Sequence, residues 1–261
     1  MIKSIETMKG AFDLSGRKAL VTGGGRGLGA TIAVALAESG ADVAIADLYE
    51  AADTVSQIQS YGVKSKSYLA DISSFADVTQ LTEDVYADFG QIDILINNAG
   101  ISAVGDFLDD ENLENWTRVL GVNLQGTAIV THAVGNRMRA LGAGGCIINI
   151  SSIASGTVVR TQNMACYCAS KAAINSLTRT TAYELGKYDI RVNAIAVGFF
   201  NSELSKMIPE GQIPYLEDTI VLGRFGEPIE LGALSVYLAS PAAAMITGAV
   251  IPINGGQDLS L

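Results

Sequence analysis

Short apolar runs alternate with helical patterns along almost the whole chain, and this alternation restricts the fold more than any other feature. The apolar runs read "KALVTGG", "DVAIAD", "KSYLADIS", "IDILINNAG", "GCIINISS", "IRVNAIAVG" and "GAVIPINGG". Most are continuously apolar, as strands are when helices cover both faces of a sheet. Helical patterns separate them and include residues 116–141 and 165–188. We predict an α/β fold with a doubly wound, seven-stranded parallel sheet and helices on both faces.

The chain reads as one domain. It has 261 residues, of which 49% are hydrophobic, so a single large core is expected and no interior boundary is visible. We therefore treat residues 1–261 as one unit, with residues 1–15 as a loosely held tail. Residues 199–225 form an irregular stretch before the last helix. Because ligands bind at the carboxyl ends of strands in such sheets, we predict that this stretch is a substrate-binding lid.

Net charge and apolar runs limit the partners. The formal net charge of −10 opposes binding to nucleic acid and to anionic membrane surfaces. The sequence has no apolar run of 18 residues, so we predict no transmembrane helix, and its N-terminus lacks the apolar stretch of a signal peptide.

The cysteines do not suggest disulfides or a metal site. Their odd count of three favours a reducing, cytoplasmic location. Cys166 and Cys168 are two residues apart, so on a helix they point in different directions. The single histidine, His132, lies in a helical pattern and has no partner ligand of the right spacing. We predict that no metal is bound and that these side chains are structural.

A glycine-rich loop follows the first strand. The stretch "VTGGGRGLGA" opens the first helix, and Gly23, Gly27 and Gly29 stand where the backbone must turn tightly and admit a ligand. A strict G-x-G-x-x-A pattern fits residues 25–30, but T-G-x-x-x-G-x-G fits the spacing better. Beyond the loop, the helix N-terminus offers N–H groups to a pyrophosphate. This strand, loop and helix order predicts a dinucleotide site.

Two aspartates follow the next strands. Asp47 ends the second strand, 18 residues after Gly29, where a carboxylate can bind ribose hydroxyls and repel the 2′-phosphate of NADP. We therefore favour NAD over NADP, although Arg26 could counter that repulsion and Asp47 could instead cap the next helix. Asp71 follows the third strand, and it either bonds the adenine amino group or caps the helix that begins near Phe75.

Six motifs in a fixed order identify a family resemblance. They are "TGGGRGLG" (22–29), "NNAG" (97–100), Asn123 in "GVNLQG", "ISS" (150–152), Tyr167 with Lys171, and "RVNAIAVG" (191–198). Over residues 14–257 the chain resembles the short-chain dehydrogenase/reductase superfamily. The resemblance implies a Rossmann fold, a nicotinamide cofactor, hydride transfer at a carbinol or carbonyl carbon, and a homotetramer. Residues 115–141, 165–187 and "GAVIPINGG" are suitable interface elements.

The resemblance also implies roles for individual residues. Ser152 corresponds to the catalytic serine, with Ser151 as its competitor, and Asn123 anchors a water relay from Lys171. Val197 and Gly198 stand where the family usually has Pro-Gly. The predicted catalytic residues are Asn123, Ser152, Tyr167 and Lys171. The predicted cofactor-binding residues are Gly23, Arg26, Gly27, Leu28, Gly29, Asp47, Asp71, Ile72, Asn98, Gly100, Tyr167, Lys171, Phe200 and Ser202.

Tyr167 and Lys171 suit proton transfer. They are four residues apart, so they share one face of a helix. Tyrosine titrates near pKa ~10, and a lysine ammonium beside it favours the phenolate and lowers that pKa. We predict that Tyr167 is the general base for alcohol oxidation and the general acid for the reverse reaction.

The substrate is less constrained. Tyr167 stands 15 residues after Ser152, and the run from Ser155 to Gln162 is similar to that of polyol and sugar dehydrogenases. We favour a polyol or other small secondary alcohol, with Cys166 among the lining residues. Phe199, Phe200 and Met207 equally suit a hydrophobic alcohol. The alternatives are an NADPH-type 3-oxoacyl-carrier-protein reductase and a non-catalytic cofactor-binding protein, which should have lost Tyr167 or Lys171.

Overall fold

The computed structural model describes residues 7–158, 163–202, 205 and 208–259. Within these ranges it contains one sheet of seven parallel strands in the order β3-β2-β1-β4-β5-β6-β7. All seven predicted strands are present. In chain order they are β1 (Lys18–Thr22), β2 (Asp42–Asp47), β3 (Ser65–Leu69), β4 (Ile94–Asn97), β5 (Gly145–Ser152), β6 (Ile190–Val197) and β7 (Val250–Ile253).

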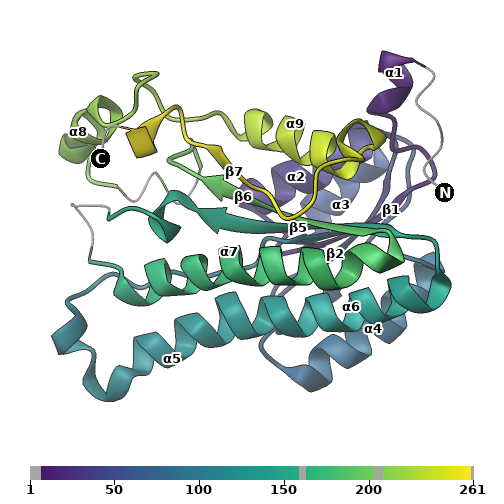
Figure 1. The fold of residues 1–261 in the computed structure, drawn as a ribbon, viewed down its shortest axis with the longest axis horizontal. Coiled ribbons are helices and arrows are strands. Elements are labelled where there is room, and N and C mark those ends of the chain that lie inside the picture. Colours follow the sequence, from purple (N-terminus) through teal and green to yellow (C-terminus); the bar gives the residue numbers. More distant parts are fainter. Residues whose placement is uncertain (1–6, 159–162, 203–204, 206–207, 260–261) are drawn as a thin grey trace.

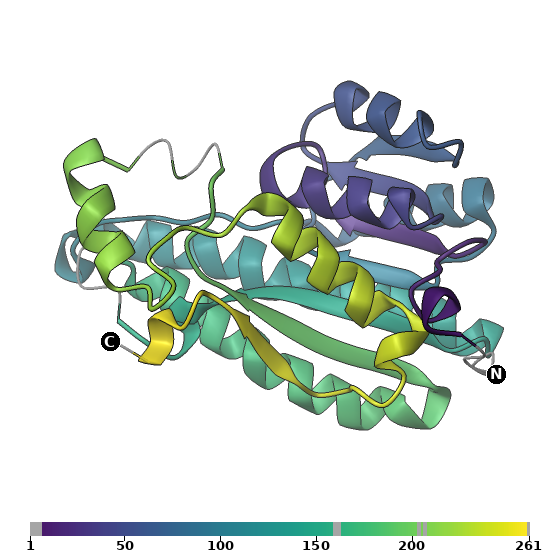
Figure 2. The same ribbon diagram turned by 90° about the horizontal axis from the view of Figure 1, so that it is seen from above.

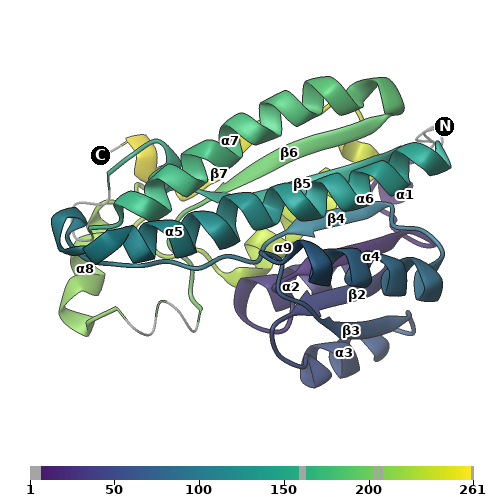
Figure 3. The same ribbon diagram turned by 90° about the horizontal axis from the view of Figure 1, so that it is seen from below.

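Helices cover both faces of the sheet, as predicted (Figures 1 and 2). One face carries α2 (Gly27–Glu38), α3 (Ala52–Gln59) and α9 (Pro228–Ala239). The other carries α4 (Phe75–Phe89), α5 (Glu114–Leu120), α6 (Thr127–Leu141) and α7 (Ala165–Leu185), as Figure 3 shows. Two shorter helices are α1 (Met8–Ala11) and α8 (Ile213–Asp218). Among the described residues, every helix is too short or too polar to span a lipid bilayer.

The core consists of one apolar cluster on each face of the sheet. Along β4, Ile94 and Ile96 belong to the cluster under α2 and α9, whereas Leu95 belongs to the one under α4 and α6. All three side chains are at most 1% exposed. This alternation follows from the two-residue period of a strand, and it explains why the strands are apolar throughout.

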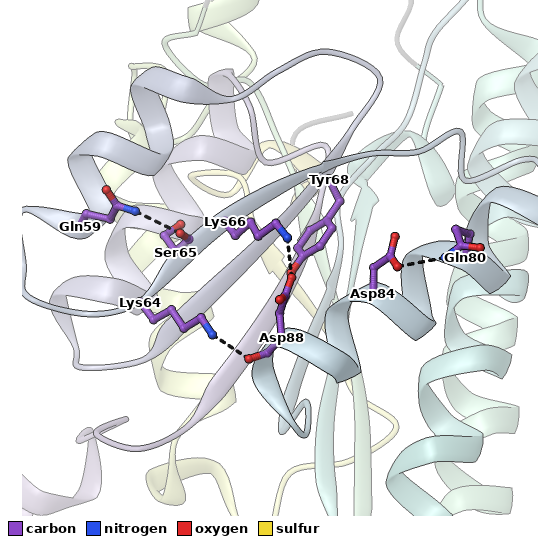
Figure 4. A network of polar contacts seen from close by, with 8 residues as sticks. All are labelled: Gln59, Lys64, Ser65, Lys66, Tyr68, Gln80, Asp84 and Asp88. Carbon is purple, nitrogen blue, oxygen red and sulfur yellow. Dashed lines mark hydrogen bonds and ion pairs between the residues drawn. The ribbon is translucent and has the colours of Figure 1, made fainter.

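The edge strand β3 is polar on its outer side. Lys66 and Tyr68 both donate to one Asp88 carboxylate oxygen, at 2.6 and 2.7 Å, and the Lys64 ammonium donates to the Asp88 carbonyl at 2.7 Å (Figure 4). These bonds hold the pKa of Asp88 below its usual value. Lysines on an edge strand discourage pairing with another chain, and here they also fasten the last turn of α4 to the sheet.

The predicted helix over residues 116–141 is not continuous. Between α5 and α6 the chain forms a π-helical segment, Gly121–Gly126, and Asn123 within it is fully buried. A π-helix inserts one extra residue per turn, which rotates the side chains that follow. The ordinary helical pattern of the sequence does not reveal this insertion.

The N-terminal segment is packed in part rather than loose. Residues 1–6 lie outside the described ranges, but Leu14 is fully buried in the cluster under α2. Its backbone N–H donates to the carbonyl of Ser39 at 2.9 Å, and the ring of Phe12 lies 6.2 Å from that of Tyr237 on α9. One apolar residue in a polar context carried too weak a signal to predict this docking.

The segment predicted as a lid has a small core of its own. Leu216, Ile220 and Phe225 are buried together, and Phe199 stacks on Phe225 with ring centroids 5.4 Å apart. The segment includes α8, which lies at the end of the molecule where α7 begins (Figures 1 and 3). Met207, which the sequence suggested as suited to a hydrophobic alcohol, lies outside the described ranges.

Candidate active site

The glycine loop joins β1 to α2 with the geometry that a pyrophosphate needs. Gly27 has a φ of +57°, and a Cβ there would meet nothing within 4 Å, so its outer side is open. A Cβ on Gly29 would lie 2.0 Å from the carbonyl oxygen of Gly23, so only glycine allows the helix to approach the loop. Among the residues that the structure describes, no side chain caps the N-terminus of α2, and the first turn of this helix carries no acid. Its N–H groups are therefore suited to an anion.

Asn98 fastens this loop to the neighbouring strand. Its amide donates to the carbonyls of Thr22 and Gly23, at 3.0 and 2.9 Å. The Thr22 hydroxyl oxygen in turn accepts from the backbone N–H groups of Asn98 and Ala99, both at 3.1 Å. Sequence reasoning named Asn98 but missed Thr22, although the threonine stands in the motif that identified the loop.

Asp47 reaches the loop from the end of β2. One carboxylate oxygen accepts from the Gly25 N–H at 2.9 Å, and the other accepts from the Tyr49 N–H at 3.4 Å. Asp47 does not cap the next helix, because the N-cap of α3 is Ala51. Arg26 lies 5.6 Å above the Tyr49 ring, so a cation and an anion flank the same turn. Thr54, which the sequence did not indicate, donates to the Gly25 carbonyl at 3.0 Å.

Asp71 and Ile72 lie in the turn between β3 and α4. The Asp71 carboxylate accepts from both the N–H and the hydroxyl of Ser73, at 2.9 and 2.7 Å. The cap of α4 is Ser74, so the interpretation of Asp71 as the N-cap is wrong. Ile72 is buried against the π-helical segment, where a Cβ on Gly126 would lie 2.8 Å from its side chain.

These features fit a dinucleotide. An open glycine cradle, an uncapped helix N-terminus and a carboxylate at the end of β2 are aligned along the carboxyl ends of β1, β2 and β4. The strand order reverses between β1 and β4, which is where such sheets bind ligands. Gly100 lies beside the catalytic lysine, since a Cβ there would be 3.6 Å from the Lys171 ammonium, and its part in holding the nicotinamide half stays a prediction.

Tyr167 and Lys171 lie on the first turns of α7, beside the end of β5. Lys171 is only 4% exposed and donates to the Ile150 carbonyl at 2.7 Å. Its ammonium lies 5.6 Å from the centroid of the Tyr167 ring. Ser151 faces the helix backbone and donates to the Lys171 carbonyl at 3.3 Å. The Ser152 hydroxyl accepts from the Ala154 N–H at 3.1 Å, and it is the serine whose side chain lowers the pKa of the Tyr167 phenol. The geometry favours Ser152 over Ser151 as the partner of the tyrosine.

Burial dominates the titration of both groups. It lowers the pKa of Lys171 to about 8. It also raises the pKa of Tyr167, and the hydrogen bond with Ser152 opposes that rise only in part. The expected lowering by Lys171 does not appear, because the ammonium lies over the ring and bonds a backbone carbonyl instead of the phenol oxygen. In the protein alone, Tyr167 therefore keeps its proton at neutral pH.

Asn123 is fixed on three sides. Its side-chain oxygen accepts from the Ile101 N–H at 2.8 Å, and its amide donates to the Ile101 carbonyl at 2.9 Å and to the Ser170 hydroxyl at 3.0 Å. The Asn123 oxygen and the Lys171 ammonium border the same space, 3.2 and 3.6 Å from where a Gly100 side chain would begin. The structure thus places three of the predicted residues, Gly100, Asn123 and Lys171, next to one another. Ser170 was missed, although it stands inside the Tyr-Lys motif.

Phe200 and Ser202 follow β6. The Phe200 side chain is buried against Gly226, where a Cβ would lie 2.6 Å from its ring. The Ser202 hydroxyl oxygen accepts weakly from the Ser205 N–H, at 3.4 Å. Their predicted part in binding the cofactor stays a prediction.

A cavity of about 170 Å³ lies beside the start of α7. Buried Cys166 lines it together with Trp116 and the loop that carries Phe107 and Asp110. Cys166 is therefore buried and borders a cavity, and its predicted contact with the substrate stays a prediction.

Comparison with known proteins gives the family. A family model described as enoyl-(acyl carrier protein) reductase matches residues 23–258. D-threitol dehydrogenase of Mycolicibacterium smegmatis is 39% identical over 251 residues, which are 95% of each chain. Galactitol 2-dehydrogenase of Cereibacter sphaeroides is 37% identical, with 95% of this chain and 97% of the relative covered. The (3R)-3-hydroxyacyl-CoA dehydrogenase of Mus musculus is 38% identical, with 91% and 95% covered.

Solved structures with the same fold lead to the same family. A short-chain type dehydrogenase/reductase from Mycobacterium marinum superposes with a TM-score of 0.91 at 36% identity, covering 95% of this chain and 97% of that one. A gluconate 5-dehydrogenase from Burkholderia cenocepacia, in complex with NADP and tartrate, superposes with a TM-score of 0.91 at 34% identity, covering 98% and 100%.

The burial of Lys171 predicts a pH-dependent stability. Its pKa is about 8 in the folded chain and ~10.5 when unfolded, so between these values the unfolded chain holds more protons and stability rises with pH. The free energy of unfolding of the wild type, relative to Lys171→Met, should therefore rise by about 1 kcal/mol per pH unit above pH 8. Denaturant titrations from pH 7 to 9.5 measure it, and a difference that stays constant with pH would contradict the assignment.

Proposed function

The chain belongs to the short-chain dehydrogenase/reductase superfamily and is an oxidoreductase that acts on CH–OH groups; we propose that it is an NAD-dependent dehydrogenase of a polyol or other small secondary alcohol. The observation that carries the proposal is the convergence of Ser152, Tyr167, Lys171 and Asn123 beside the glycine loop. A bound nicotinamide would supply the hydride acceptor. The protein's task is to hold the alcohol and to move its proton.

The proton path starts at the alcohol oxygen. Ser152 holds that oxygen beside Tyr167, whose phenolate takes the hydroxyl proton while the hydrogen on carbon leaves as hydride, so that a ketone forms. Because burial raises the pKa of Tyr167, oxidation needs positive charge beside the phenolate. The Lys171 ammonium and the oxidised nicotinamide are the two cations proposed for that role. In reduction, the protonated Tyr167 gives its proton to the carbonyl oxygen.

The polyol substrate rests on the relatives. Threitol and galactitol dehydrogenases match nearly the full chain. The second candidate is reduction of a 3-oxoacyl thioester, which the hydroxyacyl-CoA relative and the description of the family model favour. For location we propose the cytoplasm, because the chain has three cysteines and all three are free thiols.

Tyr167→Phe tests the reaction. Cofactor absorbance at 340 nm is followed with threitol, galactitol and acetoacetyl thioesters, each with the NAD and NADP forms. We expect polyol oxidation with NAD, and we expect Tyr167→Phe to lower kcat by about 10²–10⁴-fold while NADH binding is kept. Near-normal turnover in the variant would refute the mechanism. Activity with the thioester and NADPH alone would support the second candidate.

The NAD preference rests on Asp47. Its carboxylate is held at the end of β2 by the Gly25 N–H, and it would repel a 2′-phosphate. Asp47→Ala combined with Leu48→Arg should raise the NADP-to-NAD ratio of kcat/KM by about tenfold or more, because repulsion is replaced by attraction. Leu48 is 60% exposed and should accept the change. Asp47→Asn is the matched control, since it keeps an acceptor for Gly25 and removes only the charge. Equal use of NADP and NAD by the wild type would contradict the preference.

We also propose a homotetramer. In support, β7 is an edge strand whose Val250 and Ile251 are only partly buried, and Tyr183 on α7 is 89% exposed. Size-exclusion chromatography with light scattering should give a mass about four times the 27.2 kDa of one chain. A species of 27 kDa at micromolar concentration would refute the tetramer.

A further inference from the structure

We propose that Ser170 is a positioning residue that ties Asn123 to the turn of α7 carrying Tyr167 and Lys171. The proposal rests on the dehydrogenase function of the site. Ser170 is fully buried, and neither the reaction nor the cofactor is expected to touch it. Its role follows from the two hydrogen bonds of its hydroxyl.

The direction of these bonds is fixed. The Ser170 hydroxyl donates its only proton to the Tyr167 carbonyl at 2.7 Å, so its oxygen is free to accept. It accepts from the Asn123 amide at 3.0 Å. The orientation of that amide is set independently, because the Ile101 N–H requires the oxygen and the Ile101 carbonyl requires the nitrogen. Ser170 therefore takes the second N–H of the Asn123 amide.

The consequence is a link between two elements that share the site. Ile101 fixes Asn123 to the chain after β4, and Ser170 fixes it to α7. The Asn123 oxygen and the Lys171 ammonium meet at the space that Gly100 leaves open. Without Ser170, Asn123 keeps its hold on Ile101 but loses its hold on the helix that carries Lys171. The distance between the Asn123 side-chain oxygen and the Lys171 ammonium is then no longer fixed.

The position of Asn123 in the π-helical segment explains why its side chain is held by other parts of the chain. Asn123 lies in the interruption between α5 and α6, where the regular helical hydrogen bonds are shifted by one residue. A buried amide side chain needs hydrogen-bond partners, and Asn123 has no access to water. The three hydrogen bonds to Ile101 and Ser170 supply them for a residue that is fully buried.

Ser170→Ala, compared with Ser235→Ala, tests the proposal. Ser235 on α9 is also fully buried, and its hydroxyl likewise donates to a carbonyl of the preceding turn, that of Leu231, at 2.9 Å. We expect Ser170→Ala to lower kcat by about tenfold, less than loss of a proton-transfer group, and to shift the pH profile of kcat with little change in NADH affinity. Ser235→Ala should leave the profile unchanged. Thermal melting of both variants reports any general loss of stability.

A double-mutant cycle with Asn123→Ala separates positioning from packing. If Ser170 acts through Asn123, adding Ser170→Ala to Asn123→Ala should cost no further activity. Fully additive losses, or an unchanged pH profile in Ser170→Ala, would overturn the proposal.

A crystal structure of Ser170→Ala gives a readout that needs no turnover. We expect the Asn123 amide to be displaced relative to Lys171, and an amide that keeps its place would overturn the proposal. Absence of alcohol oxidation by the wild type would instead refute the proposed function. The crystal structure would still decide the role of Ser170.

Discussion

Parallel pairing of the strands is the constraint on which the site depends. Because all seven run in one direction, the carboxyl ends of β1, β4 and β5 open along one edge, where the glycine loop, Asn98 and Ser152 meet. The register is fixed by polar groups as well as by apolar burial. Asn97 donates to Asn149 on the next strand at 2.8 Å, deep between the sheet and its helices. A slip of one residue in either strand would turn that strand's amide into the apolar cluster on the opposite face and break the pair.

Around the catalytic pair, burial sets the chemistry. An exposed lysine four residues from a tyrosine would lower the tyrosine's pKa only slightly, since water screens the charge. In this protein Lys171 is desolvated, which costs stability at neutral pH and leaves an ammonium whose effect on nearby charge is little screened. The same desolvation raises the pKa of Tyr167, so that in the protein alone the phenol keeps its proton at neutral pH. Lys171 is thus already buried before substrate binds, and the stability lost by burying it must be offset by the rest of the fold.

The sequence predicted the strands and the loop because both are local patterns. Continuous apolar runs mark strands covered on both faces, and a tight turn that admits a ligand needs glycine at Gly27 and Gly29. The interruption at Asn123 was not predicted, because residues 121–126 have no composition that distinguishes a π-helix from an α-helix. The pKa of Tyr167 was predicted in the wrong direction, because spacing gives the neighbours of a phenol and not its access to water.

The hydrogen bonds from Asn98 to the glycine loop limit when this loop can become rigid during folding. The bond from Asn98 to the Gly23 carbonyl joins residues 75 positions apart, and β1 pairs on one side with β4 rather than with a near neighbour in sequence. Contacts of such separation form late, after the entropy of a long loop has been overcome. An emerging chain that ends before β4 therefore carries the whole glycine motif without a rigid cradle. During synthesis, the loop can be held in this way only once β4 has docked beside β1.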